Sequence, residues 1–209
     1  MKLGFLLLLP LLTGPPASGP TAVRVTFKSL TKSAYLQAKK GCVTAKPRVT
    51  FPFKKGRGRI VIPTAKGQKI YQDKRQGTDD DDQAQFEYAG YTPQFGYHAI
   101  TAHLWERTQT FLIDKNGQQL ELYDAPQYAP DMKSFVVASS GLEYSVYPNS
   151  IRLFRFENRA WREVWSIAPK TWEPGQICWV SPNALLLRKK IWTETSFGNT
   201  FTYSRMVIK

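Results

Sequence analysis

The sequence predicts an all-β fold made of repeated antiparallel strands, with one short helix near the N-terminus. Three observations support this prediction. Short β-branched and aromatic runs are bounded by turn residues, residues 151–156 alternate with a period of two, and Asn116-Gly117 is a hairpin turn signal. With 209 residues, 42% of them hydrophobic and 13% aromatic, the chain is long and apolar enough for one domain with a core.

Residues 1–19 have the order of a secretory signal peptide. Lys2 gives a basic start, residues 3–12 are an apolar run, and residues 13–22 are rich in Pro, Gly, Ser and Ala. The run is shorter than the roughly twenty apolar residues that span a bilayer core. We therefore expect an exported protein, periplasmic or extracellular, that is cleaved between residues 17 and 22. Its mature chain, residues 20–209, is expected to form a single domain without a transmembrane segment.

The first elements follow in chain order. Residues 23–27 alternate and form either a strand or a linker. Residues 31–40 are helix formers with Thr31 or Ser33 as N-cap, and Gly41 follows them. Residues 48–53 and 59–62 are expected to pair as a hairpin around Lys54-Lys55-Gly56-Arg57-Gly58, and residues 69–72 to add a short strand.

The remainder of the chain is expected to contain only strands. Residues 134–139 (SFVVAS) form a short apolar run, which indicates a strand that is buried on both faces. In residues 161–167, strict alternation places Trp161 and Trp165 on one face, and the mixed polarity of both faces favours an edge strand. The other expected strands are 86–91, 97–104, 109–113, 118–123, 151–156, 177–180, 184–192 and 201–208.

A weak internal repeat links two of these strands. Residues 128–131 (YAPD) and 180–183 (VSPN) each precede an apolar strand, and their prolines, Pro130 and Pro182, are separated by 52 positions. A period near fifty with three or four strands per unit is typical of β-propeller blades. Lys133 also matches the last residue of the Ser-Pro-Asp-Gly-Lys turn of such blades, although Ala129 and Met132 depart from that turn.

With these turns, residues 86–209 resemble exported bacterial proteins with β-propeller-like repeats. The resemblance implies a fold and a compartment, and it carries no activity. Closed propellers typically have four to eight blades, whereas this chain has room for about three units. The expected architecture is therefore a partial or open propeller-like arrangement, or a sandwich-like one.

Positive charge is concentrated in the first third of the chain. The net charge is +13, and residues 20–76 contain fifteen Lys or Arg but only one acid, Asp73. Phe51 and Phe53 lie among these cations and could stack on bases or sugars. The alternative is a solvated face that keeps the protein soluble, with both phenylalanines in the core. The candidate anion-binding residues are Lys39, Lys40, Lys54, Lys55, Arg57 and Arg59.

The two cysteines, Cys42 and Cys178, leave two alternatives open. An oxidising compartment would allow a disulfide between them, but Cys178 has apolar neighbours and could equally be a small buried hydrophobe. The sequence contains no CxxC and only two histidines, His98 and His103, so no metal site and no cofactor are expected.

Three further groups of residues are candidate sites. His98 and His103 are five residues apart, which places them on opposite faces of a strand. The four aspartates of residues 79–82 lack the EF-hand pattern, which favours a solvated acidic loop over a Ca²⁺ site. Trp172 and Trp179 flank a Pro-Gly turn and are the candidates for exposed aromatic contacts.

These observations favour a non-enzymatic, exported binding or scaffold module. Its expected partner is a polyanion or an anionic cell surface, engaged through the basic N-terminal segment. One alternative is a hydrolase or lyase of an extracellular polymer that uses His98 or His103. The other is a protein-interaction module whose partner is another exported protein.

Overall fold

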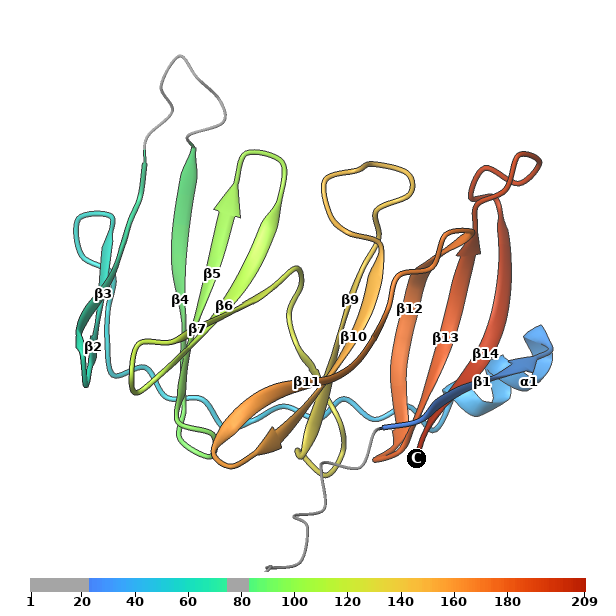
Figure 1. Cartoon of the computed structure of the whole chain (residues 1–209), viewed down its shortest axis with the longest axis horizontal. Coiled ribbons are helices and arrows are strands. Elements are labelled where there is room, and N and C mark those ends of the chain that lie inside the picture. Colours follow the sequence, from blue (N-terminus) through green and yellow to red (C-terminus); the bar gives the residue numbers. More distant parts are fainter. Residues whose placement is uncertain (1–22, 75–82) are drawn as a thin grey trace, which may run out of the picture.

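The computed structural model describes residues 23–74 and 83–209 and confirms a mostly β protein with antiparallel sheets and one short helix (Figure 1). The expected signal peptide, residues 1–19, and the aspartates of residues 79–82 lie outside the described residues. The elements are β1 (Val25–Leu30), α1 (Lys32–Lys39), β2 (Arg59–Thr64), β3 (Gly67–Gln72), β4 (Ala84–Thr92), β5 (Tyr97–Leu104), β6 (Thr108–Asp114), β7 (Gln119–Leu122), β8 (Gln127–Tyr128), β9 (Ser134–Ser139), β10 (Ser150–Glu157), β11 (Ala160–Ile167), β12 (Trp172–Ser181), β13 (Ala184–Ile191) and β14 (Thr200–Ile208).

The strands form three four-stranded sheets and one hairpin, which lie in a row (Figure 1). The hairpin pairs β2 with β3, and the first sheet has the order β4-β5-β6-β7. The second sheet runs β8-β9-β10-β11, so β11 lies at an edge as expected. The third sheet is β12-β13-β14, and β1 joins it beside β14, which places the two ends of the described chain in one sheet.

A hydrophobic core lies between each pair of neighbours in this row, that is, between the hairpin and the first sheet and between successive sheets. The second sheet is buried on both faces because side chains alternate along its strands. Phe135 and Val137 of β9 pack toward the first sheet, and Val136 between them packs toward the third. All three side chains are buried, which confirms the expectation for this strand. The hairpin and the first sheet share a further core around Ile60, Ile100 and neighbouring residues.

The helix α1 covers part of the outer face of the third sheet. The Thr31 side chain accepts a hydrogen bond from the Ala34 amide at 3.1 Å, so Thr31 is the N-cap that the sequence predicted. Tyr35 is the buried residue of the helix, and its ring centroid lies 4.7 Å from that of Tyr203 on β14. This contact packs the middle of the helix against the third sheet.

Two expectations about strands are wrong. Residues 48–53 do not pair with residues 59–62; β2 pairs instead with β3 through a turn at Ala65-Lys66. Trp161 and Trp165 do not share a face, because the β10–β11 register shifts between Leu153 and Phe154. Trp161 therefore packs toward the first sheet, and Trp165 toward the third.

Candidate binding surface

Residues 40–58, which we call the strap, connect α1 to β2 and cross all three sheets (Figure 1). The strap meets the edge strand on the same side of each sheet, namely β12, β8 and β4 in turn. Covering these edges removes unpaired backbone groups that would otherwise template aggregation. At about 3.3 Å per extended residue, the bridged stretch of the strap measures about 23 Å. The three bridged pairs are Val43–Trp179, Ala45–Tyr128 and Thr50–Tyr91.

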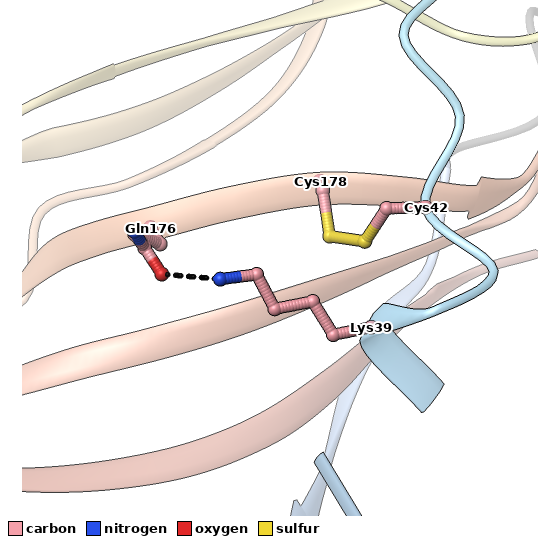
Figure 2. The surroundings of a disulfide bond; sticks show 4 residues. All are labelled: Lys39, Cys42, Gln176 and Cys178. Atoms are coloured by element: carbon pink, nitrogen blue, oxygen red, sulfur yellow. Dashed lines mark hydrogen bonds between the residues drawn. A yellow bond between two sulfur atoms is a disulfide. The ribbon is translucent and has the colours of Figure 1, made fainter. Parts of the chain in front are cut away.

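A disulfide anchors the start of the strap to β12. The structure joins Cys42 and Cys178, whose Cα atoms are 5.7 Å apart, and Figure 2 shows this bond beside the end of α1. Lys39 donates a hydrogen bond from Nζ to Gln176 Oε1 at 3.1 Å, on the same strand (Figure 2). The Val43 amide donates to the Trp179 carbonyl at 2.8 Å. One end of the strap is thus held by covalent, side-chain and backbone contacts.

The six predicted anion-binding residues lie in two groups, one at each end of the strap. Lys39 and Lys40 lie at the end of α1 beside the third sheet, and the other four lie at the hairpin end. Lys46 and Arg48 occupy the stretch between the two groups. All eight residues are exposed, and they follow one another along the strap and at its two ends.

Lys55 differs from the other cations because it has internal partners. Its Nζ lies 2.5 Å from Asp73 Oδ2 and donates to the Phe86 carbonyl at 2.8 Å. Burial alone would raise the pKa of the Asp73 carboxyl, but hydrogen bonds from Lys55 and the Phe86 amide outweigh it and lower the pKa. Lys55 therefore ties the strap to β3 and β4. Among residues 23–74 and 83–209, no ion pair involves Lys46, Arg48, Lys54, Arg57 or Arg59.

An aromatic cluster lies beneath the hairpin end of the strap. Phe53 is half-buried, and its ring centroid is 6.0 Å from Tyr88 and 5.4 Å from His98. Tyr91 completes the cluster at 4.6 Å from His98. Phe51 contacts only its edge, at 6.3 Å from Tyr88, and is 65% exposed. Phe51 is therefore not a core residue, whereas Phe53 packs against the core shared with the hairpin.

Within this cluster, His98 is hydrogen-bonded to Tyr88. The Tyr88 hydroxyl and His98 Nδ1 share a hydrogen bond of 2.8 Å. Burial lowers the pKa of His98, and burial, with a smaller contribution from Tyr91, raises the pKa of Tyr88 to about 12. Both shifts favour the uncharged forms of these groups at neutral pH, so the positive charge at this end of the strap comes from its Lys and Arg residues.

Gly90 on β4 allows the strap to approach this closely. A Cβ atom added at Gly90 would lie 2.2 Å from Val49 Cγ1, 3.0 Å from the Thr50 carbonyl oxygen and 3.2 Å from the Phe51 ring. The residue also has a φ of 106°, which side-chain-bearing residues rarely adopt, and it follows a bulge after Tyr88. A glycine at this position is thus required both by conformation and by contact.

A cavity of about 380 Å³ opens where the strap passes between the second and third sheets. Val43, Ala45 and Val49 of the strap line it together with Ile177 and Trp179 of β12, and Lys46 is the only lining residue of a cationic or acidic type. Trp179 is 1% exposed and donates from Nε1 to the Gln127 carbonyl at 2.8 Å. The expectation that Trp179 is an exposed aromatic contact is therefore wrong, because its ring belongs to the core between these sheets.

The remaining residues that the sequence suggested as sites are Trp172, His98 and His103, and each has contacts within the protein. Trp172 is half-buried, and Lys189 Nζ lies 4.5 Å from its ring centroid, so a cation already occupies part of this aromatic surface. His103 contacts Thr108 at 3.3 Å and Glu87 at 3.6 Å, whereas His98 faces the aromatic cluster. Within the described residues, no three His, Cys, Asp or Glu side chains form a metal-binding group.

Sequence reasoning missed the contribution of β4 and β5 to this surface. Tyr88, Tyr91 and His98 are more than thirty positions from Phe53, and nothing in their spacing indicated contact with the basic segment. The pair Ala89-Gly90, which interrupts an otherwise alternating strand, was the available signal of close backbone approach.

Comparison of the chain with protein-family models, with curated proteins and with solved structures found no match. In the part of the chain that the structure describes, α1 is the only helix, and no helix has the length and apolar character needed to cross a membrane.

Proposed function

We propose that the protein is an exported, non-enzymatic binding module that holds an anionic polymer or anionic cell surface along the strap. The observation that carries the proposal is the series of exposed strap cations, of which all but Lys55 have no ion pair within the described residues. Clustered cations gain affinity for a polyanion by displacing its counterions. An extended, edge-bound strap suits a linear ligand, because successive cations meet successive anionic groups.

The anchoring of the strap favours binding over a purely solubilising role. The cations project from a segment that is cross-linked at Cys42 and paired to three sheets, so little ordering entropy is lost on contact with a ligand. The Cys42–Cys178 disulfide also accords with an oxidising compartment, which supports export.

The proposal includes a propeller-like architecture of partial or open form. Its support is the succession of four-stranded antiparallel sheets, each beginning at the edge that the strap covers. The contribution of the N-terminal strand β1 to the last sheet is a second point of support, because it joins the chain ends as ring-forming repeats do.

Salt elution from a heparin matrix tests the proposed function. The test variant is Lys54→Gln, Arg57→Gln and Arg59→Gln combined, which spares Lys55 because of its pair with Asp73. We expect this variant to elute at clearly lower salt than the wild type, since three exposed cations are lost.

The matched control removes the same charge elsewhere. Arg162, Lys170 and Arg205 are exposed residues outside the strap, and their combined change to Gln should shift elution much less. Equal shifts for the two triple variants would show that retention reflects net charge alone and would overturn the proposal.

A further inference from the structure

The hairpin end of the strap presents an aromatic ring to solvent. Phe51 is 65% exposed, although large apolar side chains usually pack inward. Two backbone hydrogen bonds hold the adjacent residue, from the Thr50 amide to the Tyr91 carbonyl at 2.8 Å and from the Tyr91 amide to the Thr50 carbonyl at 2.7 Å. Together with the close contact to Gly90, these bonds leave the backbone that carries the ring little freedom.

Cations flank this ring along the chain. Arg48 precedes Phe51 by three positions and Lys54 follows it by three, and both are exposed and free of ion pairs within the described residues. In an extended segment, three positions correspond to about 10 Å. Arg57, at the turn before β2, adds a third exposed cation. Along the chain, the exposed ring of Phe51 therefore has exposed cations both before and after it.

From this arrangement we propose that the Phe51 end of the strap binds single-stranded nucleic acid, with a base stacked on Phe51 and phosphates held by Arg48, Lys54 and Arg57. This inference rests on the proposed function and specifies its ligand. Single strands are bound by the combination of a basic groove or line with aromatic side chains, because every base offers a π face. A duplex hides those faces within its own stack.

A membrane surface is the main competing ligand, and the geometry favours it less. Interfacial binding depends on a broad apolar face that enters the headgroup region. On the strap, the exposed large apolar side chains are Val43, Val49 and Phe51. Lys46 and Arg48 separate Val43 from the other two, so these side chains do not form a broad apolar face. A constrained backbone beneath the ring also favours stacking, because preorganisation reduces the entropy lost on binding.

The experiment compares probes that differ only in their bases. Fluorescence anisotropy measures binding of a labelled dT15 oligonucleotide and of an abasic strand with the same length and phosphate charge. We expect the wild type to prefer dT15. Phe51→Ala should weaken dT15 binding by about 5- to 150-fold, the range found for loss of one base–aromatic stack, and leave the abasic strand within about twofold.

Three variants complete the test. Phe197→Ala removes an equally exposed ring, 66% accessible, far from the strap in sequence, and should leave dT15 binding unchanged. Phe51→Trp keeps a stacking face and should retain binding. Circular dichroism and thermal unfolding of Phe51→Ala should match the wild type, because the ring is mostly solvated.

The other outcomes separate this inference from the proposed function. Retention on heparin without preference for dT15 over the abasic strand would overturn the stacking inference alone. Stronger binding to vesicles of anionic phospholipid, lost in Phe51→Ala, would replace nucleic acid by a membrane. Absence of binding to every anionic probe would overturn both.

Discussion

Replacing Cys42 and Cys178 by alanine releases the strap from β12 and tests how strongly the cross-link stabilises the fold. The two residues are 136 positions apart. A cross-link that closes a loop of this length removes unfolded-state entropy equivalent to about 5 kcal/mol at 25 °C. Domains are typically stable by about 5–15 kcal/mol, so the double variant is expected to lose a large part of its free energy of unfolding.

Urea unfolding followed by tryptophan fluorescence measures this loss. With a slope of about 2–3 kcal/mol per molar urea, the midpoint should fall by about 2 M. Wild-type protein unfolded in the presence of dithiothreitol is the control and should reach the same midpoint as the double variant. A loss below about 1 kcal/mol would refute the reasoning, because the strap would then be held by backbone pairing and packing alone.

Hydrogen exchange provides a local test of the same cross-link. The Val43 amide, bonded to Trp179, is next to the disulfide, whereas the Thr50 amide bonds to Tyr91 at the other end of the strap. In the double variant under native conditions, Val43 should exchange faster while Thr50 keeps its relative protection. Equal acceleration at both amides would indicate global opening rather than local release.

Three more predictions concern the stability of the fold. Gly90→Ala should destabilise the protein by about 2–5 kcal/mol in chemical unfolding, through contact with Val49 and the positive φ. Glu173 is 2% exposed and accepts hydrogen bonds from two loop amides and an indole N–H, so Glu173→Ala should cost about 2–4 kcal/mol. Because burial lowers the pKa of His98, the unfolded chain binds its proton first, and stability should fall as the pH drops below about 6.5 toward the folded pKa. His98→Gln should remove that part of the pH dependence.

Each of these predictions has a matched comparison. Gly96→Ala is the control for Gly90, since Gly96 has a positive φ but no atom within 4 Å of an added Cβ, and it should cost only about 1 kcal/mol. Glu173→Gln keeps the shape and one acceptor oxygen, and it should be milder than Glu173→Ala. Identical pH profiles for wild type and His98→Gln would contradict the prediction, because they would show that the pKa of His98 is the same in the folded and unfolded states.

Local signals predicted the elements whose formation depends on near neighbours. Thr31 caps α1 because its side chain reaches an amide three residues later, and this N-cap pattern is visible in the local sequence. The β9 strand matches the expected residues 134–139, because its apolar run requires burial on both faces. The Asn116-Gly117 turn joins β6 to β7 for the same kind of local reason, with Gly117 at a φ of 80°.

Pairing over long distances was not accessible from the sequence. Residues 48–53 were expected to form a hairpin with the next strand, but Thr50 pairs with Tyr91 of β4. Strict alternation placed Trp161 and Trp165 together, and one register shift separated them. The position of Trp179 in the core likewise depends on the second and third sheets closing over it.

By itself, the sequence determined the β character, the capped helix and the concentration of positive charge in the first third, because these depend on composition and on residues close together in the chain. Only the tertiary structure decided that the charge lies along an extended strap, that Cys42 meets Cys178, and that Phe51 remains exposed beside Tyr88. The physical reason is that edge-strand pairing and ring packing join residues tens of positions apart. Local sequence patterns do not specify which strand edges pair.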